Sequence, residues 1–597
     1  TAQFFLPKEK AGDYITDGTF REYLAGRAIQ GQAVAQAMAL AVEKRFFHWF
    51  LEFPEVMANG GFDCILGNPP FLGGQKISGM FGKNYLEYLK IAYAPAGSCD
   101  IVTYFYRRIF TIIRDKGFQS LLATNTIAQG GAREGGLDVI TKSGGTINHA
   151  VRSMRWPGAA AVEVALVTIY KGQWTGALTL NRKPVQQITS YLDDAEELGN
   201  PFPLKQNEGK SFQGSIVLGM GFILTPEEAQ RLIELDPRNK EVVFPYLNGD
   251  DINSRPDQSP SRWVINFHDW PIEKARQYKK PFEIVERLVK PERTRKKPNG
   301  EFALRKPMPQ KWWIYAEKRP KLYQTIAPLE RVLVVARISK TVAFTFVPKD
   351  IVYADALVVH ALNDWASFAL LQSSINYNWA WNYCTTMKTD LNYTPTATFE
   401  KLPFPQLPSS ACYRRLNEIG KTYYEHRLKL MTACQLGLTK IYTQFHNSNL
   451  SHIIQGQMGN FLDTEDKLEN YGKDTLNLWK HLHNSNNVCS FNEAVAGIHE
   501  LRRLHLEMDQ AVLAAYGWDK DGPDGPAIDL RHDFYEVDYL PENDRIRFTI
   551  HPDARREILK RLLLLNHRIH EREVKDGLCD KNAIRTKEQN NQIQFDI

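Results

Sequence analysis

Apolar residues recur at two different spacings along the first 200 residues. Residues 20–50, FREYLAGRAIQGQAVAQAMALAVEKRFFHWF, carry them at helical spacing, whereas the short apolar run FDCILG from Phe62 is typical of a buried strand. A helical stretch at 100–114, a strand at 120–123 and the β-branched run VEVALVTIY from Val162 follow. This alternation of helices and strands predicts a parallel α/β sheet.

The pattern changes near residue 205. Beyond it Pro, Trp and Arg are frequent, turn signals multiply, and short strands are predicted at RWVINF from Arg262 and RVLVVA from Arg331. After the Pro-rich stretch 401–410, helical spacing returns in RRLNEIGKTYYEHRLKLM and IHELRRLHLEMDQAVLAAYG. We therefore expect an α/β domain at 1–204, a mixed α+β domain at 205–410 and a helical region at 411–597.

Composition narrows the class of protein. Of the 597 residues, 43% are hydrophobic and 24% are charged, and no apolar run approaches the roughly 20 residues that span a bilayer. The net charge of +6 permits a polyanionic partner without requiring one. Seven cysteines without a CxxC pair argue against a disulfide framework and a zinc site. With no secretion signal at the start, we expect a cytoplasmic protein that binds no metal.

The run FDCILG ends directly in Asn68-Pro69-Pro70-Phe71, at the edge of the sheet where open α/β folds bind their ligands. The Asn68 side-chain oxygen and the Pro69 carbonyl, held by prolines of fixed φ, could each accept one N–H of a target amine. The nitrogen lone pair would then face a methyl donor, and in-line transfer depends mainly on positioning. Phe71 would stack on a base flipped out of a duplex. A plain turn followed by a core aromatic is the alternative.

The residues around this tetrad resemble a known family. FHWFLEFPEVMANGGFDCILGNPPF is similar to motif IV of the gamma-type amino methyltransferases found in Type IIG (Eco57I-like) restriction-modification and phage-defence systems, and SCDIVTYFYRRIF, LLATNTI and RWPGAAAVEVALVTIYKG resemble the elements that follow it. The resemblance implies the C-terminal part of a Rossmann-like class I methyltransferase sheet and adenine-N6 methylation with S-adenosylmethionine. It places Asn68 and Pro70 at the cofactor and Trp156 on the second face of the flipped base. For Trp156 the alternative is an indole packed at a strand start.

One part of the family pattern is missing. No glycine-rich, acidic-ended cofactor loop precedes Asn68, and the chain starts at Thr1 rather than Met, so we expect the preceding strands in a separate chain or a preceding part. Gly219-Met220-Gly221 lies between a strand-like run and a capped helix start, where a cofactor loop would lie. Because a lone GxG is a weak signal, we interpret it as a turn.

Residues 287–321 form the most basic stretch, with twelve Lys and Arg against three Glu. Trp and Tyr interleave with these charges, as expected where a protein follows a phosphate backbone. A solvated basic face is the alternative. Sequences from FPYLNGDDINSRPDQSPSRWVINF to YTPTATFEKLPFP resemble the target recognition domain of Type IIG enzymes. We predict DNA contacts from Arg293, Arg295, Lys296, Lys297, Lys311 and Trp312.

The tetrad alone leaves several substrates open. Enzymes that methylate N4 of cytosine, an exocyclic amine in RNA or a glutamine amide in a protein use the same chemistry, because each target is a delocalised NH2. The large basic region favours double-stranded DNA, and adenine follows from the family resemblance alone. A DNA-binding subunit of a defence complex, of the DISARM or BREX type, is a further alternative. The sequence shows no acidic pair followed by Glu-x-Lys that would indicate a nuclease.

Overall fold

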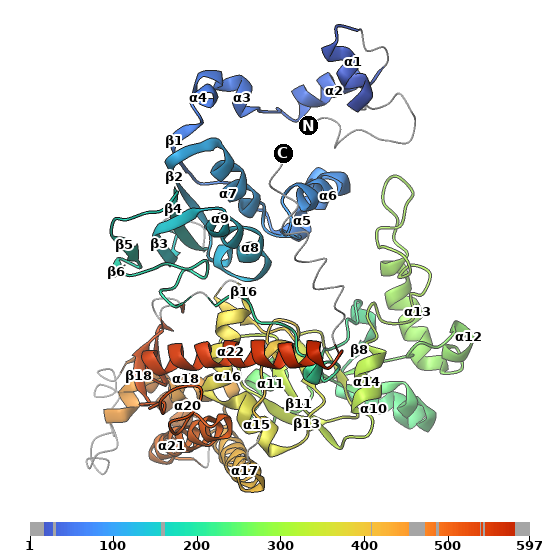
Figure 1. Cartoon of the computed structure of the whole chain (residues 1–597). Coiled ribbons are helices and arrows are strands. Elements are labelled where there is room, and N and C mark those ends of the chain that lie inside the picture. Colours follow the sequence, from blue (N-terminus) through green and yellow to red (C-terminus); the bar gives the residue numbers. More distant parts are fainter. Residues whose placement is uncertain are drawn as a thin grey trace. The chain divides into compact units, whose positions relative to one another are not determined.

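The computed structural model of the chain divides into two compact units, Thr1–Glu197 with Asn582–Ile597, and Leu198–Lys581 (Figure 1). The two later predicted domains both fall within the second unit, and the division into three domains stays a prediction. The structure describes residues 17–27, 32–156, 162–196, 198–387, 389–406, 409–452, 472–484, 489–537, 539–540 and 544–578. Cys579 and residues 157–161 of the RWPGAAAVEV motif lie outside them.

The first unit is built on a six-stranded sheet with strand order β1-β2-β4-β3-β5-β6. The strands are β1 (Phe62–Gly67), β2 (Ile113–Thr124), β3 (Gly145–Arg155), β4 (Glu163–Lys171), β5 (Leu178–Leu180) and β6 (Lys183–Val185). β1 pairs with β2 and β3 with β5 in parallel, whereas β4 runs antiparallel to both β2 and β3. The predicted parallel sheet is therefore wrong in part. Only residues 156–162 separate β3 from β4, and a parallel crossover needs a dozen or more.

The helices of the first unit are α1 (Asp17–Leu24), α2 (Gln32–Glu43), α3 (Trp49–Glu52), α4 (Pro54–Ala58), α5 (Gly74–Phe81), α6 (Lys83–Ala92), α7 (Ile101–Ile112), α8 (Gly130–Gly135) and α9 (Leu137–Lys142). α7 and α9 contribute buried side chains to the core that packs on the sheet. The predicted helix at 100–114 is confirmed as α7, whose Val102 and Tyr106 share a buried core with Leu121 of β2 and Val167 of β4.

The helix expected across residues 20–50 is divided into shorter segments. After α2, Arg45 adopts a left-handed φ of 51°, a conformation that ends helices. The chain then turns so that Trp49 and Phe53 pack edge-on against Phe62, with ring centroids 5.5 and 5.3 Å away. An aromatic cluster over the start of β1 thus replaces the last turns of the predicted helix.

The prediction that β1 is buried is wrong. β1 lies at the margin of the described sheet, with Leu66 74% exposed and Cys64 exposed. An apolar run of six residues satisfies the pattern of a buried strand, but the pattern does not report whether both faces are covered.

In the described residues of the second unit, the strands form four small sheets, ordered β14-β9-β10-β8, β13-β11-β15-β7, β12-β17-β16 and β18-β19. The predicted strands at Arg262 and Arg331 are confirmed as β10 and β11. The strands are β7 (Ser211–Gln213), β8 (Ile223–Leu224), β9 (Val243–Leu247), β10 (Arg262–Ile265), β11 (Arg331–Ala336), β12 (Ile338–Ser339), β13 (Thr345–Pro348), β14 (Val352–Tyr353), β15 (Leu357–His360), β16 (Thr385–Met387), β17 (Asp390–Asn392), β18 (Asp533–Glu536) and β19 (Ile546–Thr549).

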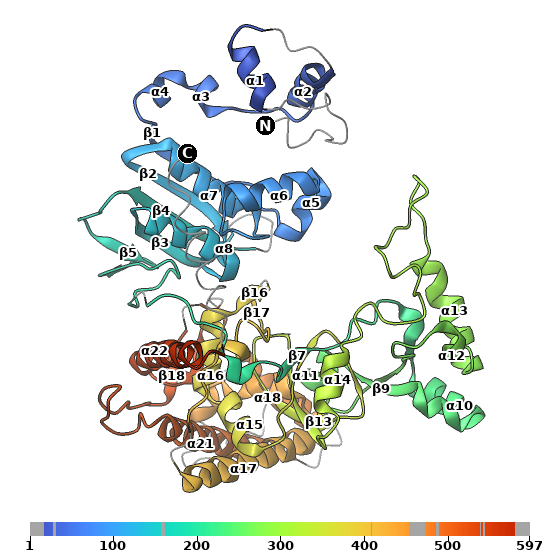
Figure 2. The same cartoon turned by 45° about the vertical axis from the view of Figure 1, so that its right-hand side comes forward.

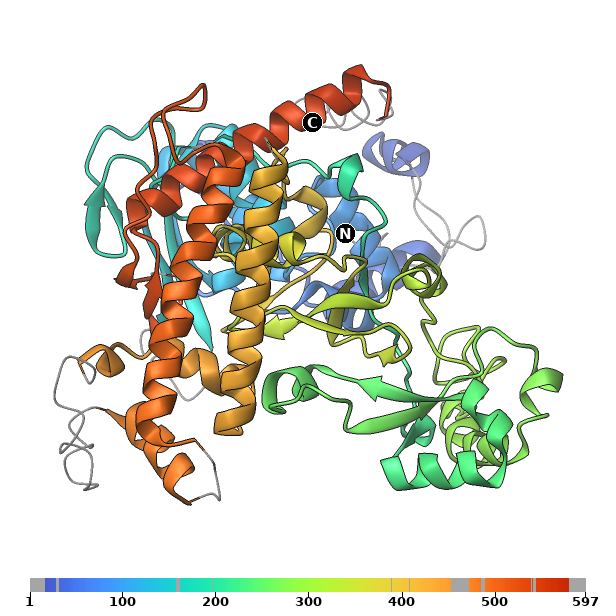
Figure 3. The same ribbon diagram turned by 90° about the horizontal axis from the view of Figure 1, so that it is seen from below.

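One hydrophobic core joins most of this unit across residue 411. It contains Val334 of β11, Met431 of α17 and Met508 of α21, and the two long helices run side by side in Figure 3. The helical region predicted after 411 therefore packs into the same core as β11 and β15. The main helices are α10 (Pro226–Leu235), α11 (Gly249–Ser254), α12 (Ile272–Ala275), α13 (Lys279–Arg293), α14 (Pro320–Ile326), α15 (Trp365–Gln372), α16 (Ser374–Tyr383), α17 (Ser410–Cys434), α18 (Leu438–Phe445), α20 (Lys473–Asn484), α21 (Phe491–Tyr516) and α22 (Pro552–Lys575).

Residues 217–315 form a lobe, called the small lobe below, around a second core to which Val352 and Ala354 also contribute (Figure 2). Phe282 and Val285 of α13 meet Val264 of β10 and Phe222 in this core. Gly221 precedes Phe222 in a 3-10 turn, and a Cβ there would lie 2.4 Å from the Cβ of Leu288 on α13. The Gly219-Met220-Gly221 segment is thus a turn that packs closely against α13. No helix in the described ranges is long and apolar enough to cross a bilayer.

Candidate functional site

Strand register brings the predicted reactive residues of the first unit to one edge of its sheet. Gly67, the last residue of β1, is paired with Leu121 near the end of β2. Arg155, the last residue of β3, is paired with Glu163, the first of β4. Because β4 is antiparallel to its neighbours, the tetrad after β1, the turn after β2 and Trp156 after β3 all leave the sheet on the same side. This side is called the tetrad edge below.

The tetrad loop is fixed by its backbone. The Asp100 carboxylate accepts hydrogen bonds from the Leu72 and Val102 backbone amides, both at 3.1 Å, and the Ile101 amide donates to the Leu72 carbonyl at 3.0 Å. Asp100 thus caps α7 and holds the end of the tetrad loop against that helix. Gly74 continues the loop where a Cβ would lie 2.2 Å from the Ser98 carbonyl oxygen.

Sequence analysis missed both of these positioning residues. An Asp directly before IVTYFYRRIF is an N-cap signal that could have identified Asp100. The need for glycine at position 74 arises from contact with residues 24 positions later, which no local pattern reports.

The reactive groups themselves face outward. Asn68 and Pro70 are exposed, Phe71 is 37% exposed and Pro69 is buried. Among the described residues, the Asn68 side chain has no hydrogen-bond partner, so its oxygen is free to accept from a ligand. The loop is held through its backbone while the side chains that would touch a target stay accessible.

A cysteine near the tetrad loop is unsuited to act as a nucleophile. The Cys99 thiol is buried and donates to the Gly131 carbonyl at 3.1 Å. Desolvation raises its pKa to about 11, so the thiolate is scarce at neutral pH. Cys99 therefore does not supply a nucleophile at this edge.

Trp156 is half-buried, and its backbone amide donates to the Val162 carbonyl at 3.0 Å. β2 and β4 separate β1 from β3, which sets the two strand ends about 14 Å apart at the usual strand spacing. A base held between Phe71 and Trp156 therefore requires both loops to lean toward each other. The role of Trp156 stays a prediction.

The structure divides the six residues predicted to contact DNA. Arg295, Lys296, Lys297 and Lys311 are exposed, and none has a carboxylate within 4.0 Å in the part of the chain described. Arg293 is only 1% exposed and donates to the carbonyls of Val217, Leu218 and Ile314.

Trp312 is 6% exposed and belongs to the core of the small lobe. The assignment of Arg293 and Trp312 to a DNA-contacting surface is therefore corrected. The Arg293 guanidinium and the Trp312 ring make their contacts inside the small lobe, because the basic stretch passes through the lobe and does not lie along its surface throughout.

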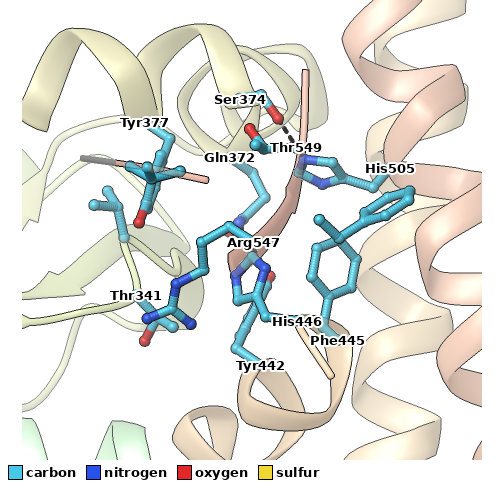
Figure 4. A pocket seen from close by; sticks show the side chains of 13 residues that line it. Thr341, Gln372, Ser374, Tyr377, Tyr442, Phe445, His446, His505, Arg547 and Thr549 are labelled. Carbon is cyan, nitrogen blue, oxygen red and sulfur yellow. Dashed lines mark hydrogen bonds between the residues drawn. The ribbon is translucent and has the colours of Figure 1, made fainter. Parts of the chain in front are cut away.

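Ser374 and His505 line a small cavity in the second unit (Figure 4), and together with Asp509 they form a buried Ser–His–Asp arrangement. It borders a cavity of about 40 Å³, where Ser374 Oγ lies 2.9 Å from His505 Nε2. Asp509 Oδ2 lies 3.5 Å from the same nitrogen. A catalytic triad needs the carboxylate and the hydroxyl on opposite nitrogens of the ring, so this arrangement cannot relay a proton from serine. It is a packing network between α16 and α21.

Comparison with known proteins agrees with the two regions identified above. Residues 16–140 match the Eco57I restriction-modification methylase family, and residues 208–406 match the target recognition domain of MmeI. The chain joins a restriction-modification methylase segment to a target recognition domain. The tetrad and the turn after β2 lie in the segment that matches the methylase family, Trp156 lies beyond it, and the small lobe lies in the segment that matches the recognition domain. No curated protein matches the chain.

Solved structures add a likeness of fold. The Type IIL restriction-modification enzyme MmeI, determined in complex with DNA, is 17% identical with a TM-score of 0.53, over 77% of this chain and 55% of that one. The DrdV–DNA complex is 10% identical with a TM-score of 0.30, over 78% of this chain and 58% of that one. Of these two matches, the one to MmeI supports a shared fold. The chain spans about half the length of MmeI.

Proposed function

We propose that the chain is the catalytic and recognition part of a site-specific DNA methyltransferase that modifies adenine N6 in a restriction-modification or phage-defence system. The observation that carries the proposal is the Asn68-Pro69-Pro70-Phe71 loop in the segment that matches the methylase family, with the side chains of Asn68, Pro70 and Phe71 exposed at the tetrad edge. A target recognition domain follows in the same chain. A loop that presents two fixed acceptors beside an aromatic ring suits a flat ring carrying an NH2 group.

The residues at this edge can hold the target amine without a strong base. The amino lone pair of adenine is delocalised into the ring, so acceptors that bind both N–H groups favour a more nucleophilic nitrogen. The Asn68 side-chain oxygen would accept one N–H and the Pro69 carbonyl the other. Asp100 holds the loop that carries them, and the prolines restrict its backbone, so the acceptors are preorganised before the base arrives.

Flipping the base out of the duplex costs a few kcal/mol, which stacking on Phe71 partly offsets. Trp156 would close the opposite face of the base. An aromatic contact of this kind tolerates any base, so discrimination of adenine depends on the two acceptors and on the recognition domain.

S-adenosylmethionine fits the chemistry of this edge and supplies an electrophilic methyl group. Asn68 and Pro70 are exposed. β1 is an edge strand of the described sheet, so one side of β1 has no paired strand, and both side chains are accessible from that side. We place the strands expected to carry the cofactor loop on that side. The exposed Leu66 on β1 is a suitable contact for them.

The test is to incubate the full-length protein with unmodified plasmid DNA and labelled S-adenosylmethionine, and then identify the labelled nucleoside after digestion. We expect N6-methyladenine. N4-methylcytosine would overturn the choice of base. Label in RNA or protein would overturn the substrate, and DNA binding without any label would favour a DNA-binding subunit of a defence complex.

A further inference from the structure

The chain that follows α13 forms a short β-hairpin, residues 295–303. Lys296 and Phe302 are bridge partners in antiparallel register, the Lys297 amide donates to the Glu301 carbonyl at 2.7 Å, and the Ala303 amide donates to the Arg295 carbonyl at 2.8 Å. In Figures 1 and 2 this segment extends past the end of α13 and away from the other elements of the small lobe.

The sequence of the turn explains why the hairpin is well defined. The Gly300 amide donates to the Lys297 carbonyl at 2.9 Å across Pro298-Asn299, and Gly300 has a φ of 84°. A type I turn followed by a left-handed residue is a standard three-residue hairpin connection, and glycine supplies the positive φ without strain. The Asn299 side chain binds the Glu301 amide and carboxylate, which closes the turn further.

The root of the hairpin is anchored in the small lobe. Arg293, two residues before the first arm, donates to the carbonyls of Val217, Leu218 and Ile314 and lies 5.2 Å from the Phe222 ring. The Thr294 hydroxyl donates to the Lys290 carbonyl at 2.7 Å. The buried Arg293 guanidinium therefore fixes the backbone directly before the exposed cations of the hairpin.

The two faces of the hairpin differ because side chains alternate along a strand. Lys296 and Phe302 lie on one face, where the Lys296 Nζ is 5.9 Å from the ring centroid and Phe302 is 38% exposed. Arg295 and Lys297 lie on the other face. Both faces are accessible, and three cations stand within three consecutive residues without a carboxylate partner among the described residues.

We propose that this hairpin enters the major groove of duplex DNA, with Lys296 and Phe302 facing the base edges and Arg295 and Lys297 reaching the phosphates. The proposal rests on the proposed function. Two strands about 4.8 Å apart, with their side chains, fit a groove about 12 Å wide but not the minor groove, which is about 6 Å wide.

The chemistry of the inward face suits base edges. A lysine ammonium can donate to the O6 and N7 acceptors of guanine, and an aromatic ring can contact the methyl group of thymine. A surface that contacts phosphates alone would gain little binding energy from an exposed Phe beside a Lys. The structure thus assigns readout to this face and positioning to Arg295 and Lys297.

The experiment compares binding of the full-length protein to three forms of one 500-bp duplex. The first is unmodified, the second carries glucosylated 5-hydroxymethylcytosine at every cytosine, which fills the major groove, and the third is saturated with distamycin in the minor groove. We expect glucosylation to weaken binding at least tenfold and distamycin to change it less than threefold.

The variant Lys296→Gln/Phe302→Ala should bind unmodified duplex about tenfold more weakly and lose most of its sensitivity to glucosylation. The matched control Arg231→Gln/Lys240→Gln changes two exposed cations elsewhere on the small lobe and should keep both. Gly300→Ala keeps every charge but strains the turn, because residue 300 has a positive φ. A weaker affinity of this variant for DNA would show that binding depends on the shape of the hairpin. Unfolding midpoints of all variants should agree with that of the parent protein.

Three results would overturn the proposal. Distamycin could block binding while glucosylation does not, or the double variant could keep the affinity and groove sensitivity of the parent protein. In either case methylation of adenine would still support the proposed function. If the parent protein binds none of the three duplexes, the proposed function fails together with this inference.

Discussion

The tetrad edge and the small lobe differ in how the structure supports their exposed functional side chains. At the tetrad edge, the side chains that would perform chemistry lie on a loop after a marginal strand, beside apolar residues such as Leu66 that the described chain leaves 74% exposed. The small lobe packs Phe282 and Val285 into a closed core, and its exposed cations project from a buried anchor. The tetrad edge thus presents its side chains beside apolar surface that is exposed in the described chain, whereas the cations of the small lobe stand on a buried support.

The largest effect should come from the tetrad. Asn68→Ala removes one acceptor for the target amine, and loss of one preorganised hydrogen-bonding group at a reacting centre costs about 100- to 1,000-fold in kcat. DNA affinity should stay within about threefold, because Asn68 lies outside the small lobe. Methyl transfer to plasmid DNA and binding of the same DNA measure the two quantities.

A matched control is Asn59→Ala, at another exposed Asn in the first unit. Within the described residues its side chain donates to the Glu55 carbonyl of its own helix and to no other group. It should leave both quantities unchanged. A large loss of DNA affinity in Asn68→Ala would contradict the separation of chemistry from recognition.

The second effect concerns the anchor of the small lobe. Arg293→Met leaves the buried carbonyls of Val217 and Ile314 and the partly buried carbonyl of Leu218 without their donor. Each unmet buried group costs about 1–3 kcal/mol, so we expect a loss of about 3 kcal/mol of unfolding free energy. Hydrogen exchange should accelerate in α13 and β10 and stay unchanged in the sheet of the first unit. The exposed neighbour Arg295→Gln should change stability by less than about 0.5 kcal/mol.

An equal loss of stability in both arginine variants would contradict this assignment. Sequence reasoning treated Arg293 and Arg295 alike, because both belong to one run of positive charge. The difference arises from tertiary contacts with Val217 and Ile314, which a charge count cannot detect.

The sequence predicted more of the local structure than of its surroundings. α7, β2, β10 and β11 follow from periodicity, and the tetrad follows from strand position and residue chemistry. The direction of β4 could have been inferred from the short link after β3, but the alternation of helices and strands suggested a parallel sheet. The exposure of β1 could not be inferred, because an apolar strand looks the same in sequence whether or not a neighbour covers it.

Trp156→Ala should have a smaller effect than the change at Asn68. Aromatic stacking on a base contributes about 1–3 kcal/mol, so kcat/KM should fall roughly 10- to 100-fold. Trp156→Phe should retain most of the activity, because it keeps an aromatic face. The fluorescence of a 2-aminopurine placed at the target adenine measures the stacking directly.

If Trp156 only packs at the end of β3, the alanine variant should lose stability and leave the fluorescence of the flipped base unchanged. That result would contradict a base-stacking role for Trp156 and would leave the proposed role of Asn68 as an acceptor unaffected.

The smallest predicted effect is a difference between the two units in how strongly their stability depends on pH. His360 on β15 is fully buried among Phe344, Tyr393 and Phe399, and neither ring nitrogen has a hydrogen-bond partner in the described chain. Desolvation lowers the pKa of His360 to about 3, against about 6.5 in an unfolded chain. Between these values the unfolded state binds more protons, so stability rises with pH and falls as the solution is acidified.

Lowering the pH from 6.5 to 5.5 should therefore cost the second unit about 1 kcal/mol through His360 alone. The described core clusters of the first unit contain no histidine, so its exchange rates should change less. His360→Phe, which keeps an aromatic ring in the cluster, should remove about 1 kcal/mol of that pH dependence in urea unfolding, and the exposed His483→Phe should not. Equal pH dependence in the parent protein and His360→Phe would show that another group governs the acid sensitivity of this core.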